Sequence, residues 1–146
     1  MLSAEISLEI FLRLLFSLAL GALIGFEREY KRRPAGLRTH MLVSLGACLF
    51  TVVSFYSFHM DPARIAAGIV TGVGFLGAGV IIGSGTHIKG VTTAATIWVV
   101  AGVGLTVGIG EYLIALMTTF LVLLILLIKP TERKMIQEFH KKKVLE

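Results

Sequence analysis

Residues 65–82 read IAAGIVTGVGFLGAGVII, and not one of them is charged. An α-helix needs about 20 mostly apolar residues to cross the hydrocarbon core of a bilayer. A lone strand would leave its backbone groups without hydrogen-bond partners in lipid, so a helix is the structure to expect. This stretch therefore predicts a transmembrane helix and places the chain among integral membrane proteins.

The composition favours the same class of protein. Of 146 residues, 55% are hydrophobic and 16% are charged, and the mean hydropathy is +0.86. A soluble domain of this length could not bury so much apolar surface. The net charge of +5 would suggest a nucleic-acid partner in a soluble protein. Here the basic residues lie beside apolar runs, so we expect anionic lipid headgroups and no nucleic acid.

Four other apolar runs flank the first, and we expect an all-α membrane protein with five transmembrane helices. The predicted spans are 8–26, 41–58, 65–82, 91–107 and 112–128. Residues 1–129 then form a transmembrane domain, and residues 130–146 form a basic cytoplasmic tail. Apolar side chains in that tail (Met135, Ile136 and Phe139) predict an interfacial helix. The first run lacks a preceding basic region, so we expect it to be retained rather than cleaved as a signal peptide.

The distribution of Lys and Arg predicts the orientation of the helices. The connection between the first two spans holds Arg28, Lys31, Arg32, Arg33 and Arg38, and six more basic residues follow the fifth span. The second and third connections carry only Arg64 and Lys89. The positive-inside bias then places the N-terminus outside and the C-terminus in the cytoplasm.

Two parts of the chain resemble each other. LGALIG (20–25) is similar to AGVIIG (78–83), and AGLRTHMLVSLGA (35–47) is similar to KGVTTAATIWVVA (89–101). This pattern indicates a parallel repeat of two helix pairs followed by a fifth helix, although low sequence complexity is an alternative explanation.

Polar and small residues within the spans leave several alternatives open. The glycines of the third span favour a central, closely packed helix, or else a helix broken near 74–79 that lines a cavity. In the second span, Ser44, Ala47, Cys48, Thr51 and Ser54 share one face, which suits helix packing or a polar path. Arg13 in the first span must reach the interface or pair with a neighbour, and Glu9 is one turn away.

Several kinds of site are missing from the sequence. It has no phosphate-binding loop, no histidine pair with metal-ligand spacing and no group of carboxylates near the membrane centre. We therefore expect no enzyme activity, no cofactor and no metal site. A magnesium channel is also hard to build without oxygen ligands along a path.

Four blocks of the sequence resemble the MgtC/SapB family of bacterial inner-membrane proteins. They are LGALIGFERE (20–29), RPAGLRTH (33–40), DPARIAAGIVTGVGFLGAGVII (61–82) and KGVTTAATIWVVAGVGLTVG (89–108). The resemblance implies a five-helix protein linked to growth at low magnesium and, in pathogens, to virulence. It also implies inhibition of the F-type ATP synthase rather than magnesium transport. Longer relatives carry a soluble C-terminal domain, so we expect this chain to be a short form.

The family motifs also supply candidate functional residues. They are Glu27, Arg28, Arg33, Gly36, Arg38, Thr39, Asp61, Arg64, Gly74, Gly77, Gly79, Thr92 and Thr93. Our leading hypothesis is a regulator whose first cytoplasmic loop contacts another membrane protein. The alternatives are a small ion or solute transporter that uses the glycine-rich third helix, and a packing subunit. We also predict a homo-oligomer, most simply a two-fold dimer, with spans 3 or 4 near the interface.

Overall fold

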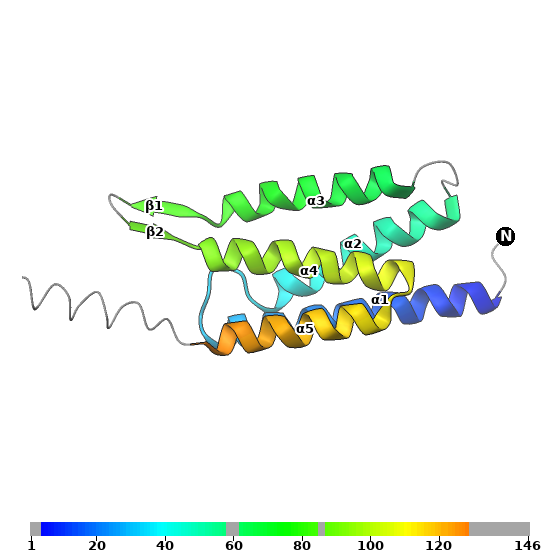
Figure 1. Ribbon diagram of the computed structural model, residues 1–146, viewed down its shortest axis with the longest axis horizontal. Helices are drawn as coiled ribbons and strands as arrows, with labels where there is room; N and C mark the ends of the chain where they lie inside the picture. The colour runs from blue at the N-terminus through cyan, green and yellow to red at the C-terminus, as the bar shows by residue number, and fades with distance from the viewer. Residues whose placement is uncertain (1–3, 58–61, 85–86, 129–146) are drawn as a thin grey trace, which may run out of the picture.

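A computed structural model describes residues 4–57, 62–84 and 87–128. The described chain forms five helices and one short hairpin (Figure 1). The helices are α1 (Ala4–Tyr30), α2 (Leu37–Ser57), α3 (Pro62–Gly79), α4 (Val91–Ile109) and α5 (Tyr112–Leu127). The strands β1 (Ile82–Ser84) and β2 (His87–Lys89) lie between α3 and α4. The predicted tail at 130–146 and Asp61 lie outside the described residues.

All five apolar runs are helical, which confirms a helical membrane protein. Three of them are long and apolar enough to cross a membrane: Glu5–Tyr30, Leu37–Tyr56 and Val91–Ile109. The other two are shorter apolar helices, Ala63–Gly79 and Tyr112–Leu127. At about 1.5 Å per residue, the 16 residues of α5 measure about 24 Å, against a hydrocarbon core of about 30 Å. Five crossings and the internal repeat stay predictions.

The third helix ends earlier than the sequence predicts. It stops at Gly79 rather than at residue 82, and β1 pairs antiparallel with β2. Gly90 closes this hairpin with a φ of 92°, and an added Cβ there would overlap the carbonyl oxygen of Val80. The β-branched residues Ile82 and Ile88 favour strands over a continued helix. The hairpin projects beyond the ends of the helices (Figure 1).

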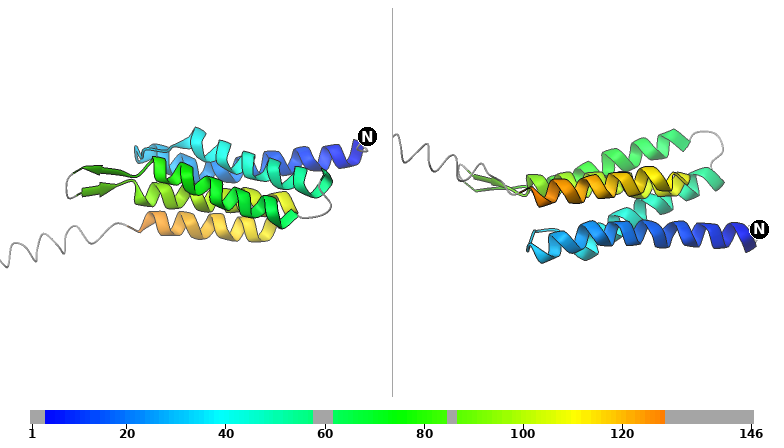
Figure 2. Two further views of the ribbon diagram at one scale, coloured as in Figure 1. Left: turned by 90° about the horizontal axis from the view of Figure 1, so that it is seen from above. Right: turned by 60° about the horizontal axis from the view of Figure 1, so that its bottom comes forward.

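The central helix is α4, and the prediction that the glycine-rich third span is central is wrong. Helix α4 contacts all four other helices, and nine of its residues from Thr93 to Gly108 are buried. Gly104 lies directly against the backbone of Ser44, and Gly108 lies against Thr51. In contrast, a Cβ added at Gly68, Gly72, Gly74 or Gly79 would meet no atom within 4 Å. Helix α3 is unbroken and lies along one edge of the bundle (Figures 1 and 2).

The hydroxyl-bearing face of α2 is buried, in line with its predicted packing role. Ser44, Ala47, Cys48, Thr51 and Ser54 are all inaccessible to solvent or nearly so. The Ser44 hydroxyl donates to the Ser17 carbonyl of α1 over 2.7 Å. The Thr51 hydroxyl donates to Ala47 of its own helix over 2.8 Å. The hydroxyls are therefore satisfied by the protein, as packing between helices requires.

Arg13 pairs with Glu9, as predicted, and also contacts a third group. Its guanidinium forms an ion pair with the Glu9 carboxylate one turn away. It also donates to the carbonyl oxygen of Gly108 over 2.6 Å. That carbonyl belongs to the last turn of α4, where free carbonyl groups carry partial negative charge. Arg13 thus fastens α1 to the end of the central helix.

Candidate functional site at the basic end of the bundle

The site is built where α1 ends and the first connection begins. Arg33 N–H donates to the Arg28 carbonyl over 3.0 Å, and Arg32 N–H donates to the Glu29 carbonyl over 2.9 Å. These two bonds form a Schellman motif, which closes a helix with one left-handed residue. Arg32 occupies that position with a φ of 52°, where glycine is the usual residue. Pro34 follows and prevents the helix from continuing.

The other end of the connection is held by Glu29. Its Oε2 accepts a hydrogen bond from Leu37 N–H over 2.8 Å at the first residue of α2. Gly36 lies so close to this carboxylate that a Cβ would overlap Oε2. The α2 helix starts at Leu37, four residues before the predicted span, because this acidic side chain caps its free N–H. The connection 31–36 is therefore fixed at both ends.

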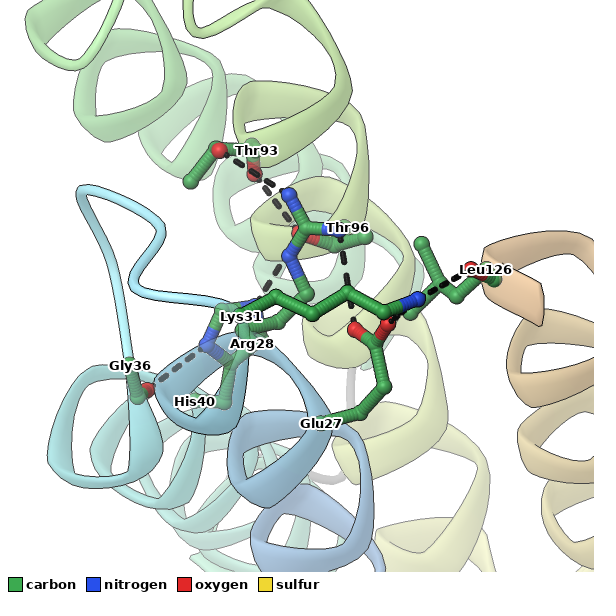
Figure 3. A network of polar contacts seen from close by, with 8 residues as sticks. All are labelled: Glu27, Arg28, Lys31, Gly36, His40, Thr93, Thr96 and Leu126. Carbon is green, nitrogen blue, oxygen red and sulfur yellow. Dashed lines mark hydrogen bonds and ion pairs between the residues drawn. The ribbon is translucent and has the colours of Figure 1, made fainter. Parts of the chain in front are cut away.

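Beneath the connection lies a network of charged side chains (Figure 3). Arg28 is only 3% exposed and donates to the Thr93 hydroxyl of α4 over 3.2 Å. Its NH1 lies 3.6 Å from Glu27 Oε2. Lys31 Nζ lies 2.5 Å from Glu27 Oε1 and donates to the Leu126 carbonyl of α5 over 2.8 Å. The Glu27 carboxylate is thus the anion that two cations share.

His40 extends the network along α4. Its side chain is fully buried, and Nδ1 lies 2.8 Å from the Gly36 carbonyl oxygen. A carbonyl accepts only, so Nδ1 carries a proton. Nε2 lies 3.0 Å from the Thr96 hydroxyl, which also lies 2.8 Å from the Thr93 carbonyl. The helix ends on either side of the first connection are therefore both joined to α4, α1 through Arg28 and α2 through His40.

The network carries one more positive than negative charge and is incompletely hydrogen-bonded. Both Glu27 oxygens and Arg28 Nε are buried, and none makes a hydrogen bond within the described structure. The ion pairs to Glu27 therefore act through charge, without the angles of a hydrogen bond. Such pairing is what keeps a buried guanidinium tolerable. Within the ranges that the structure describes, no three His, Cys, Asp or Glu side chains gather as a metal site would require.

The structure brings together four of the predicted residues and separates the others. Glu27, Arg28, Gly36 and Thr93 belong to the network, whereas Arg33, Arg38, Thr39 and Thr92 are exposed around it. Arg64 is exposed near the start of α3, at the opposite end of the bundle (Figure 1). Of the α3 glycines, Gly77 faces Ala94, which a Cβ added at Gly77 would meet at 3.5 Å, while Gly74 and Gly79 face open space.

Four members of the site are not among the candidate functional residues that the family motifs supplied. They are Glu29, Lys31, His40 and Thr96, and each lies within or next to the stretches that supplied the predicted residues. The signal for His40 was its spacing, because a histidine four residues after Gly36 lies one helical turn from that glycine's carbonyl. Lys31 lies four positions after Glu27, which is a local signal for their ion pair. Its contact with Leu126 carried no such signal, because the two residues are 95 positions apart.

Together these features define a helical membrane protein with a buried charged network at one end. A fixed basic connection covers that network. Residues 14–135 match the profile of the MgtC family, and the chain belongs to this family. No solved structure matches the chain.

Three curated relatives illustrate the match. Protein MgtC of Salmonella typhimurium is 49% identical over 112 residues, which are 77% of this chain and 48% of that protein. The putative magnesium transporter YhiD of Escherichia coli K12 is 43% identical over 138 residues, covering 87% of this chain and 64% of the relative. The uncharacterized protein slr0014 of Synechocystis is 46% identical over 116 residues, covering 79% and 50%. The chain thus spans about half to two thirds of these relatives.

Proposed function

We propose that this protein is a membrane regulator that supports growth at low magnesium by binding another membrane protein through its basic connection. The observation that carries the proposal is the way this connection is held. The buried network and the Glu29 cap fix its backbone, while the side chains of Arg32, Arg33 and Arg38 stay exposed. A fixed loop presents its guanidiniums with little loss of entropy on binding.

The chemistry of the loop indicates an acidic partner. Guanidinium groups bind carboxylates through paired hydrogen bonds, and such contacts are common at the centre of interfaces. Arg28 is excluded from this role because its charge is already used inside the bundle. By resemblance to the family, the F-type ATP synthase in the bacterial inner membrane is the candidate partner. With the N-terminus outside, the loop faces the cytoplasm.

Site-specific photocrosslinking tests the proposal. A crosslinking residue at Thr39, which is exposed beside Arg38, should capture one membrane protein in intact cells, to be identified by mass spectrometry. Replacing both arginines, Arg33→Ala with Arg38→Ala, should weaken capture by about tenfold or more, because each charged contact at an interface is worth about 1 kcal/mol or more. Growth at low magnesium and the cellular ATP level should also change in this double variant.

The matched control is Lys89→Ala, which removes an exposed positive charge from β2 at the same end of the bundle. It should leave capture and growth unchanged. If the double arginine variant, present at normal levels, captures the same partner and grows normally, the loop is not the binding site.

A transporter is the second candidate, and the name of the YhiD relative favours it. In that case purified protein in liposomes should carry magnesium or phosphate. Gly77→Leu should abolish the flux, because Gly77 packs directly against Ala94 of α4 and a larger side chain would force α3 away. Liposomes that carry neither ion would remove this candidate.

A further inference from the structure

An apolar groove of about 630 Å³ runs between α2 and α3. Its walls include Gly46 and Phe50 of α2 and Gly68 and Gly72 of α3. A Cβ added at any of these three glycines would meet no atom within 4 Å. The glycines therefore do not bring helices of this chain together, and their effect is to leave the groove deep.

The groove is charged at one end only. Arg64, in the first turn of α3, lines one end, and Leu76 lines the other. Leu76 lies twelve positions after Arg64 along the helix, which is about 18 Å at 1.5 Å per residue. One leaflet of a bilayer has a hydrocarbon thickness of about 15 Å, half of the whole core. The groove is thus about as long as one leaflet is thick, and its cation lies at one end of that length.

The charged end lies away from the basic connection. Helix α3 begins at the end of the bundle where α2 finishes, whereas the first connection and the hairpin lie at the other end (Figure 1). The two sites therefore lie at opposite ends of the bundle (Figure 1).

We propose that this groove binds an acyl chain of an anionic phospholipid from the leaflet opposite the basic connection, with the lipid phosphate at Arg64. The apolar walls suit a hydrocarbon chain, and a guanidinium suits a phosphate. A second copy of α3 fits this end less well, because a parallel copy would bring its own Arg64 toward the first. Two guanidiniums repel each other, whereas a lipid phosphate is attracted to either of them.

Native mass spectrometry of the purified protein tests the proposal. The protein is mixed with phosphatidylglycerol or with phosphatidylcholine of identical chains, and bound lipid is counted. The wild type should retain phosphatidylglycerol preferentially. Gly72→Leu fills the groove and should abolish retention. Gly74→Leu is the matched control, because Gly74 is equally open but does not line the groove, and it should retain lipid.

Arg64→Gln tests the contribution of the lipid headgroup to binding separately from that of the acyl chain. The preference for phosphatidylglycerol should fall about fivefold, the size expected for one basic residue near an anionic surface, while chain binding persists. If Gly72→Leu does not give a folded protein, Gly46→Leu blocks the groove from the other wall.

Three results would overturn the proposal. One is equal lipid retention by the groove-filling variants and the wild type. Another is an unchanged preference for phosphatidylglycerol in Arg64→Gln. The third is a lipid-free dimer that Gly72→Leu dissociates, because the groove would then bind a second copy of the chain.

Discussion

At the scale of single residues, the buried pair of Glu27 and Arg28 makes the sharpest energetic prediction. Glu27→Gln removes the anion beside a guanidinium that is 3% exposed. An uncompensated buried charge costs about 3 kcal/mol or more, so the free energy of unfolding should fall by that amount. Adding Arg28→Met should recover most of the loss, because the unpaired charge disappears. Thermal or denaturant unfolding in mild detergent measures both changes. A Glu27→Gln variant as stable as the wild type would show that Glu27 does not stabilise the buried charge of Arg28.

Arg32 supplies a second prediction at this scale, with the opposite sign. Its φ of 52° is a conformation that glycine adopts without strain and that costs other residues about 1 kcal/mol. Arg32→Gly should therefore raise the free energy of unfolding by up to about 1 kcal/mol. Arg33→Gly is the control, because Arg33 does not adopt a positive φ, and it should not stabilise. A loss of stability in Arg32→Gly would mean that the guanidinium itself supports the fold.

At the scale of helices, two glycines on α4 differ in whether they pack against another helix. Gly104 lies against the backbone carbonyl of Ser44, whereas Gly102 meets no atom within 4 Å of an added Cβ. Gly104→Ala must push α2 and α4 apart, so we expect a loss of about 2 kcal/mol in the free energy of unfolding. Gly102→Ala should be neutral or stabilise by up to about 1 kcal/mol, because alanine is the better helix former. Equal effects of the two substitutions on the unfolding midpoint would contradict this assignment of the packing glycines.

At the scale of the whole molecule, the glycines that remain open predict self-association. Gly74 and Gly79 of α3 and Gly102 of α4 pack against nothing within the described chain. A helix gains from backbone contact at glycine, and lipid provides no equivalent contact. We therefore expect a two-fold dimer with α3 or α4 at or near its interface. Light scattering in mild detergent, together with crosslinking in native membranes, measures the mass. A monomer by both methods would contradict the prediction.

The class of protein, the helical runs and the family follow from the amino-acid sequence alone. Hydropathy over about 20 residues is a local property, so it is readable without knowledge of packing. The sequence also predicted the pairing of Arg13 with Glu9, because residues four apart share a helix face. The site was partly predictable for the same reason, since Glu27, Arg28 and Gly36 lie in one short motif.

The identity of the central helix and the pairing of the polar residues depend on how the helices pack. A count of glycines favoured the third span, yet α4 is buried, because contact between helices depends on which face each glycine occupies. The contacts of Arg28 with Thr93 and of Lys31 with Leu126 join residues 65 and 95 positions apart. No local pattern encodes such pairs. They follow from the way four helices pack around α4, which brings the end of α1 against the start of the central helix.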